Sequence, residues 1–163
     1  KYIYLNSFAQ LSKIKIGIGN ENMTCEHKYK PDGGQVYDFA IDEKLNKLIL
    51  NDLKSSYTNI RILKLDNFQL MYTVVQEITM IYRSWYDADT KLMVGKEING
   101  PIIKHFKFSE DLDKFESSYS IEAKEYKNWC PILYYKKERI MFMGTMNYLV
   151  ALTTDTRKII GRF

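Results

Sequence analysis

The chain has 163 residues, of which 45% are hydrophobic and 27% charged, and this composition excludes a disordered chain and describes one globular domain or a piece of one. Thirteen Tyr and eight Phe against three Pro favour a β-rich class. The net charge of +4 is mild and spread among acidic residues, and no apolar run approaches the roughly 18 residues of a membrane span, so we expect neither a nucleic-acid nor a membrane partner.

The first half of the chain divides into two groups of short strands. The first group has an apolar run at residues 2–5, isoleucines at alternate positions from Ile14 to Ile18, and a run at 24–29. Residues 30–34 then break the pattern with proline and glycine. The second group contains four predicted strands, at residues 36–41, 48–50, 60–65 and 69–75.

The second half repeats this arrangement. The third group has strands at residues 78–85, 92–95 and 103–108, with turns at 86–90 and at Asn99-Gly100, a dipeptide that suits a tight hairpin. Its outer strand, 118–123, follows an acidic segment at 109–116 that reads as a loop or one helical turn. The fourth group has strands at residues 131–135, 140–144, 149–152 and from 159.

The four groups recur at a regular period. The second strand of each begins near Ile14, Leu48, Leu92 and Ile140, at intervals of 34, 44 and 48 residues. Periods near 40 residues with about four strands each indicate a β-propeller. We therefore predict an all-β fold of about four antiparallel blades of a partial propeller, at roughly residues 1–31, 32–75, 76–123 and 124–163. The residues predicted to be buried on inner strands are Tyr82, Trp85, Leu92, Val94, Ile140, Phe142 and Leu149.

Catalytic chemistry is poorly represented. His27 and His105 are the only histidines, both lie on strands predicted to face outward, and neither has a partner at the spacing of a triad or a metal site. Two acidic pairs, Asp87 with Asp89 and Asp111 with Asp113, lie in predicted turns, where aspartate caps backbone donors. We predict no catalytic residue, no metal and no cofactor.

The sulfur-containing and tryptophan side chains are predicted to be structural. Cys25 and Cys130 are too few for a disulfide framework, and we expect a buried, reduced, intracellular pair. The methionines Met141, Met143 and Met146 and the tryptophans Trp85 and Trp129 are also predicted to lie in the core.

The acidic segment 109–116 is the candidate for a partner contact. We expect it to be an exposed connection, longer than its equivalents in the other blades. Its carboxylates favour a basic protein partner, or simply keep an edge strand soluble. The predicted contact residues are Glu110, Asp111, Asp113, Lys114 and Glu116.

Most of the chain, from about Lys13 to Leu152, resembles a known repeat family. Residues 92–95 with Gly100, Ile103 and 106–108, followed by Phe115-Glu116 and then 132–152, resemble two successive WD-type repeats. More narrowly, they resemble the C-terminal blades of the cilia- and flagella-associated WD-repeat proteins near the inner dynein arms. The Gly-His before each blade and the Trp-Asp that ends a third strand are missing. At the ends of the third strands, where Trp-Asp would stand, this sequence has Lys28-Tyr29, Lys64-Leu65, Lys107-Phe108 and Ala151-Leu152.

This resemblance implies a non-enzymatic scaffold that binds other proteins in a large cytoskeletal assembly of the ciliary or flagellar axoneme, such as axonemal dynein or microtubule-associated proteins. It would dock a dynein arm or a doublet microtubule. Such propellers generally have seven blades, so we expect these four to belong to a longer chain and to aggregate or oligomerise when produced alone.

An alternative is a secreted carrier of a small ligand. Residues 25–33 followed by 62–68 loosely resemble the lipocalins, although the Gly-x-Trp that opens a lipocalin barrel is absent before Cys25. The cysteines distinguish the two functions, because free thiols favour the scaffold and a disulfide between Cys25 and Cys130 favours the carrier.

Overall fold

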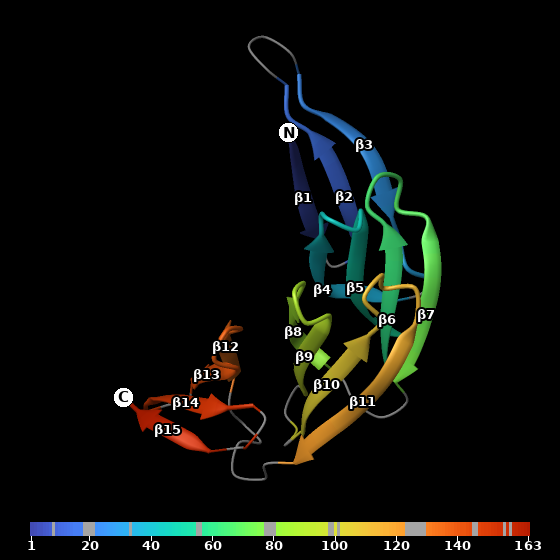
Figure 1. Cartoon of the computed structure of the whole chain (residues 1–163). Helices are drawn as coiled ribbons and strands as arrows, with labels where there is room; N and C mark the ends of the chain where they lie inside the picture. Colours follow the sequence, from blue (N-terminus) through green and yellow to red (C-terminus); the bar gives the residue numbers. More distant parts are fainter. Residues whose placement is uncertain are drawn as a thin grey trace. The chain divides into compact units, whose positions relative to one another are not determined.

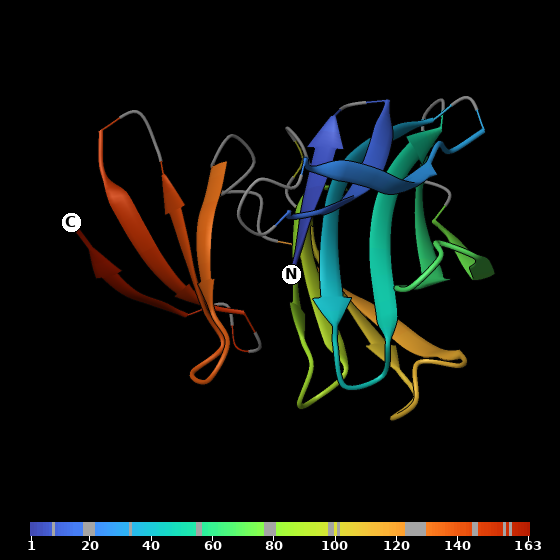
Figure 2. The same cartoon turned by 90° about the horizontal axis from the view of Figure 1, so that it is seen from above.

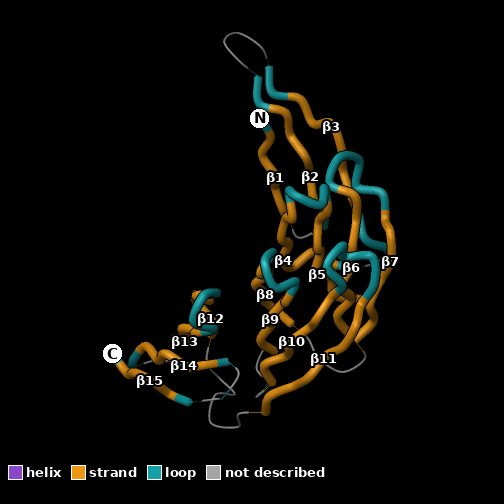
Figure 3. The backbone as a smooth tube through the Cα atoms, viewed as in Figure 1, coloured by secondary structure: helices purple, strands orange, loops and turns teal. Residues whose placement is uncertain are grey.

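The computed structural model describes residues 1–7, 9–17, 22–32, 34–54, 57–76, 81–97, 100, 102–122, 130–144, 147–154, 156 and 158–163. These residues form strands, turns and loops, and none of them is helical (Figure 3). The chain divides into two compact units, Lys1–Thr79 and Met80–Phe163, which we describe separately.

The first unit consists of two antiparallel sheets (Figure 1). Their strands follow one another in sequence, as expected where tight turns join neighbours. The three-stranded sheet contains β1 (Tyr2–Ser7), β2 (Gln10–Lys15) and β3 (Thr24–Tyr29); the four-stranded sheet contains β4 (Gln35–Asp42), β5 (Lys47–Lys54), β6 (Tyr57–Lys64) and β7 (Leu70–Gln76).

These two sheets bury one apolar cluster between them. Each strand alternates its side chains between two faces, so one face of each sheet carries the apolar residues of the contact. Tyr4 and Phe68 approach with ring centroids 6.4 Å apart, and β1 and β2 lie against β4. The cluster consists of Leu11, Val36, Leu48, Leu50, Leu63, Leu65 and Phe68, with Tyr4, Tyr29, Phe39 and Ile41 packed against it.

The second unit also consists of two antiparallel sheets, each with four strands in sequence order (Figure 2). One sheet contains β8 (Ile81–Asp87), β9 (Leu92–Glu97), β10 (Ile102–Phe108) and β11 (Phe115–Glu122). The other contains β12 (Cys130–Tyr135), β13 (Ile140–Gly144), β14 (Leu149–Thr153) and β15 (Ile159–Arg162). The predicted all-β fold of antiparallel sheets is confirmed.

The second unit has its own core. Trp85 on β8 and Tyr134 on β12 join the two sheets, with ring centroids 6.2 Å apart. Each sheet contributes one face, because side chains alternate along its strands. The cluster consists of Val94, Ile103, Tyr134, Met141, Met143 and Leu152, with Trp85, Leu92 and Ile159 packed against it.

The burial predicted for the inner strands is confirmed in part. Val94 is fully buried, whereas Trp85 and Leu92 are half-buried at the edge of the core. The prediction that Ile140, Phe142 and Leu149 are buried is wrong, because these half-buried residues lie on the face of their sheet opposite Met141 and Met143. Other predictions fall on residues or side chains outside the described part: Ile18, Gly33, Ile78, Tyr82, Asn99, Ala123, Trp129, Cys130, Ile132 and Met146.

One turn geometry recurs in the three four-stranded sheets. The residue before the second strand of each sheet is Asn46, Lys91 or Arg139, and each has a φ of 53°. In each case its carbonyl oxygen accepts a hydrogen bond from the end of the third strand, at 2.8, 3.1 and 2.9 Å from the N atoms of Leu65, Phe108 and Thr154. The left-handed conformation of this residue determines the direction in which the chain leaves the turn and enters the second strand. The sheets are therefore structural repeats.

Several predicted strand boundaries differ from the structure, and two of these differences lie next to turns of the third group. Strand β8 extends to Asp87, so the turn occupies residues 88–91 rather than 86–90. Strand β11 begins at Phe115 rather than Ser118, because the chain passes from a six-residue loop directly into pairing with β10.

Candidate partner-binding surface

The acidic loop, residues 109–114, joins β10 to β11 and is organised around Ser109. The Ser109 hydroxyl accepts hydrogen bonds from the backbone N–H groups of Asp113 and Lys114, both at 3.1 Å, and donates to the Asp111 carboxylate at 2.7 Å. The same carboxylate accepts the Asp113 N–H at 3.1 Å. Short polar side chains that bind nearby backbone donors hold a loop in one conformation.

Leu112 anchors the acidic loop from within. It has a φ of 56°, its N–H donates to the Ser109 carbonyl at 2.9 Å, and its side chain is fully buried. A leucine in the left-handed region is uncommon and persists where its surroundings over-determine it. The segment was predicted to be an exposed connection, and this is wrong for Leu112 and Ser109, which are buried.

The predicted contact residues nevertheless lie at the surface. Glu110, Asp111, Asp113 and Lys114 are exposed in the loop, and Glu116 is exposed at the beginning of β11. Residues 65–69 and 154–158 make the equivalent connections of two other sheets, so the acidic loop is one residue longer than either.

Hydrogen bonds within the loop favour the charged form of the Asp111 carboxyl group. The Ser109 hydroxyl and the Asp113 N–H both stabilise the carboxylate of Asp111 and lower its pKa below the ordinary value. Asp111 is therefore charged at neutral pH. The loop can present carboxylates in a fixed arrangement to a cationic surface.

Strand β11 continues this surface from the loop. It forms one edge of its sheet, and its described side chains after Phe115 are exposed. Tyr119 stacks on His105 of β10, with ring centroids 4.3 Å apart and an interplanar angle of 6°. The stack holds an exposed tyrosine in place, a residue type that is enriched at protein interfaces.

Both histidines differ from the prediction that they face outward. His105 is almost fully buried, because it lies on the central strand β10 opposite Val94 and beneath Tyr119. His27 is half-buried, with its ring centroid 6.2 Å from that of Phe68. Both rings therefore contribute to packing.

The acidic pair in the third group caps its turn as predicted. The Asp87 carboxylate accepts hydrogen bonds from the Asp89 N–H at 3.2 Å and from the Thr90 hydroxyl at 2.7 Å. Among the described residues, no three His, Cys, Asp or Glu side chains come together as a metal site requires. The same part of the chain contains no helix with the length and hydropathy of a membrane span.

For Cys25, the prediction of a reduced thiol is confirmed and the prediction of burial is wrong. This residue is a free thiol and is exposed on β3, where it pairs with Ile14 on the face of the sheet opposite the core. The methionine prediction is confirmed for Met141 and Met143, which are fully buried in the core of the second unit.

Sequence reasoning missed several buried charged groups, of which two have clear partners. The Arg61 guanidinium donates to the fully buried Asp52 carboxylate at 2.7 Å across neighbouring strands. Lys96, also almost fully buried, donates to the carbonyls of Glu97, at 2.8 Å, and of Gly100. No feature of the sequence distinguishes these charged residues from those that face solvent.

No protein-family model matches the sequence, and no curated protein matches it. Solved structures do match. The β-propeller domain of Cps50 (Swd1) from Myceliophteria thermophila matches 99% of this chain with a TM-score of 0.71 and 10% identity. A protein from Lactobacillus plantarum matches 99% with a TM-score of 0.70 and 12% identity, and the C-terminal WD40 domain of Sif2 matches 97% with a TM-score of 0.65 and 6% identity.

The chain spans a little over half of these structures, namely 57%, 53% and 55% of their lengths. The strand pairing also disagrees with the barrel that a lipocalin-like carrier requires, because the described strands form four separate sheets. The four sheets of three or four antiparallel strands, which are repeated along the chain and similar to those of WD40 domains, are blades. The fold is that of four WD40-like blades of a β-propeller.

Proposed function

We propose that this chain is a non-enzymatic propeller scaffold whose acidic loop binds a basic protein partner. WD40 propellers typically bind other proteins. The observation that carries the proposal is the preorganised loop, in which Ser109 and the buried Leu112 hold the backbone while Glu110, Asp113 and Lys114 remain exposed. A loop that is already ordered loses little entropy on binding.

The charge of this surface favours a basic partner. The acidic loop and the first residues of β11 carry four carboxylates, at Glu110, Asp111, Asp113 and Glu116, against one cation, at Lys114. Complementary charge raises the rate of association and excludes partners of like charge. Binding through this surface is therefore expected to weaken as salt increases.

We further propose that the partner belongs to the ciliary or flagellar axoneme, where the scaffold docks a dynein arm or a doublet microtubule. This proposal rests on the resemblance of residues 92–152 to the blades of WD-repeat proteins near the inner dynein arms. It places the protein in the cytoplasm, on the cytoskeleton.

Cosedimentation with purified axonemes tests both proposals. The wild-type chain is expected to pellet with axonemes, and Glu110→Lys combined with Glu116→Lys is expected to reduce the bound fraction at least tenfold. These two exposed positions are chosen because the bonds that order the loop come from Ser109 and Asp111. Glu138→Lys, in the exposed turn between β12 and β13, is the matched control and should bind as the wild type does.

The two proposals can fail separately. If the wild-type chain does not pellet with axonemes, the axonemal assignment is wrong. If binding occurs but the double variant and the Glu138→Lys control bind equally well, the acidic loop is not the contact.

A further inference from the structure

Each of the two sheets in the second unit has a charged end, formed by a turn and a loop. In the first of these sheets, the turn at residues 88–91 lies beside the acidic loop, because the Phe108 N–H donates to the Lys91 carbonyl at 3.1 Å. Lys91 is buried, and the ammonium of the half-buried Lys107 donates to the Thr90 carbonyl. We call this surface the acidic end. Its exposed charged residues are Asp89, Glu110, Asp111, Asp113 and Lys114.

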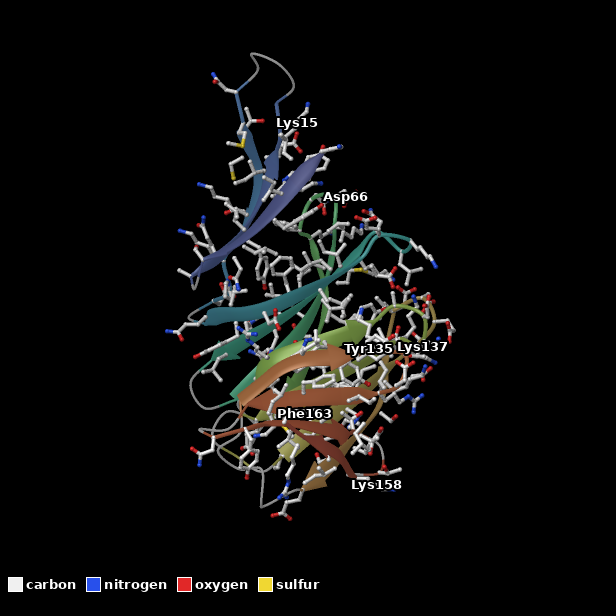
Figure 4. All side chains as sticks on the ribbon, turned by 90° about the vertical axis from the view of Figure 1, so that its left-hand side faces the viewer. Lys15, Asp66, Tyr135, Lys137, Lys158 and Phe163 are labelled. Atoms are coloured by element: carbon white, nitrogen blue, oxygen red, sulfur yellow. The ribbon has the colours of Figure 1, made fainter. Side chains whose placement is uncertain are left out.

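The last sheet has the equivalent end with the opposite charge. The turn at residues 136–139 lies beside the connection from β14 to β15, because the N–H and the hydroxyl of Thr154 donate to the Arg139 carbonyl at 2.9 and 3.2 Å. In Figure 4, Lys137 and Lys158 lie toward the same end of this sheet. We call this surface the basic end. Its exposed charged residues are Lys136, Lys137, Glu138, Arg139 and Lys158.

The two ends are neighbours within the second unit. Asp87, which caps the turn of the acidic end, lies two residues beyond Trp85, and Lys136 lies two residues beyond Tyr134. The two aromatic rings are 6.2 Å apart, and two residues of strand span only about 7 Å. Burial raises the pKa of the Tyr134 phenol, and the charges of Arg139 and Asp87 shift that pKa in opposite directions. One phenol therefore interacts with a charge from each end.

The signs of these charges indicate the chemical class of the partner. The acidic end exposes four carboxylates and one cation, and the basic end exposes four cations and one carboxylate. Asp155 and Arg157 lie outside the described residues and add one charge of each sign to the sequence of the connection. A nucleic acid or an anionic membrane is negative along its whole surface, so the acidic end would repel what the basic end attracts. A protein segment can carry both signs in separate blocks. Neighbouring ends of opposite sign therefore match a protein segment.

From this juxtaposition we infer that the basic end binds an acidic segment of the same protein partner whose basic segment binds the acidic loop. The inference rests on the proposed function and adds a second contact to it. Two contacts made by one partner chain strengthen each other, because the first raises the effective concentration at which the second forms. The two ends also determine which part of the partner lies on which sheet, since the reverse placement would bring like charges together.

Fluorescence anisotropy of the whole chain with fluorescein-labelled peptides tests this inference. The block peptide has a run of lysines, a Gly-Ser linker and a run of glutamates. The alternating peptide has the same composition with lysine and glutamate interleaved, and the lysine peptide has alanines in place of the glutamates. The salt concentration is about 0.15 M, at which charges more than about 8 Å apart are largely screened. The wild type is expected to bind the block peptide at least tenfold more tightly than either of the others.

Charge reversal identifies the surface. Lys136→Glu combined with Lys137→Glu is expected to weaken binding of the block peptide at least tenfold without weakening binding of the lysine peptide, a result that an unfolded variant would not give. Lys28→Glu combined with Lys30→Glu makes the same change in net charge at exposed positions of the first unit. This matched control should bind the block peptide as the wild type does. Glu138→Lys keeps all four cations of the basic end and should retain binding as well.

Failure of the basic end and failure of the acidic loop give different results. Equal affinities for the block and alternating peptides, or equal losses in the Lys136→Glu, Lys137→Glu variant and its control, would overturn the inference. Tighter binding of a single-stranded oligothymidylate than of the block peptide would overturn the choice of a protein partner. The lysine peptide tests the proposed function separately: if it does not bind the wild type, or if Glu110→Lys combined with Glu116→Lys does not weaken its binding, the acidic loop is not the contact.

Discussion

The two units differ in the side-chain interactions that hold their two sheets together. In the first, the contact between sheets includes directed polar bonds: the buried Lys13 ammonium donates to the carbonyls of Leu65 and Asp66 at 3.4 and 2.9 Å, and Asn6 donates to the Val36 carbonyl at 3.3 Å. In the second, Met141 and Met143 fill the core together with the aromatic side chains of Tyr134 and Trp85.

This difference separates two sources of specificity. Hydrogen bonds from Lys13 have fixed partners, so they favour one register of the first sheet on the second. Methionine is flexible and fills irregular gaps, so the methionines of the second core contribute packing that has no fixed direction. The first unit should therefore be sensitive to loss of a polar group, and the second to loss of volume but tolerant of its redistribution.

The largest effect is expected from removing core volume in each unit. Leu50→Ala and Met141→Ala each delete a fully buried side chain and should lower the free energy of unfolding by about 2–5 kcal/mol. The leucine variant should lie nearer the upper end, because the adaptable methionines around position 141 can move into the space left there. Urea denaturation of both variants measures the difference. Equal losses would contradict the idea that the second core is the more adaptable.

The next effect should come from the lysine of the first unit. Lys13→Met keeps most of the apolar stem but leaves the Leu65 and Asp66 carbonyls without their donor, and should cost about 1–3 kcal/mol. Lys28→Met, at an exposed position on the neighbouring strand, is the control and should change stability by less than about 0.5 kcal/mol. If the two variants unfold at the same urea concentration, the Lys13 bonds contribute nothing to stability.

A smaller effect is expected at the left-handed turn residues. Asn46 in the first unit tolerates a φ of 53° better than Arg139 in the second, because asparagine is enriched in that region. Arg139→Gly should therefore raise stability by up to about 1 kcal/mol, and Asn46→Gly by less. Thermal melts report both changes. A loss of stability in Arg139→Gly would show that the arginine side chain outweighs the strain of its backbone.

The smallest effect concerns the titration of the acidic loop. The Ser109 hydroxyl lowers the pKa of Asp111, so Ser109→Ala should raise that pKa toward its ordinary value. Since the folded pKa is the depressed one, the contribution of Asp111 to loop order is present above the ordinary carboxyl pKa and is lost as pH falls through the depressed value. A carboxyl carbon NMR titration measures the pKa in both proteins. An unchanged midpoint would show that the serine does not hold the carboxylate.

Much of the fold follows from local sequence signals. Alternating apolar residues and turn dipeptides predicted the strands, and the period of about 40 residues predicted their grouping into four sheets. Strand ends were less well predicted where a polar residue such as Asp87 continues a strand, because hydrogen bonding to the neighbour decides the boundary.

The candidate site was predicted only in part. Its charge and its position between two strands can be seen in the sequence. The roles of Ser109 and Leu112 cannot, because no sequence pattern marks a serine that binds several backbone groups or a buried leucine with a positive φ.

By itself, the sequence determined the repeat, the β class and the acidity of the loop, because these depend on neighbours within a few residues. Only the tertiary structure decided which face of each strand is buried. Cys25 and His105 show the reason: both lie on strands, and Cys25 falls on an exposed edge while His105 lies on a central strand beneath Tyr119. Burial depends on what the rest of the chain brings against a residue, and pairing between strands and packing between sheets are not encoded within any one strand.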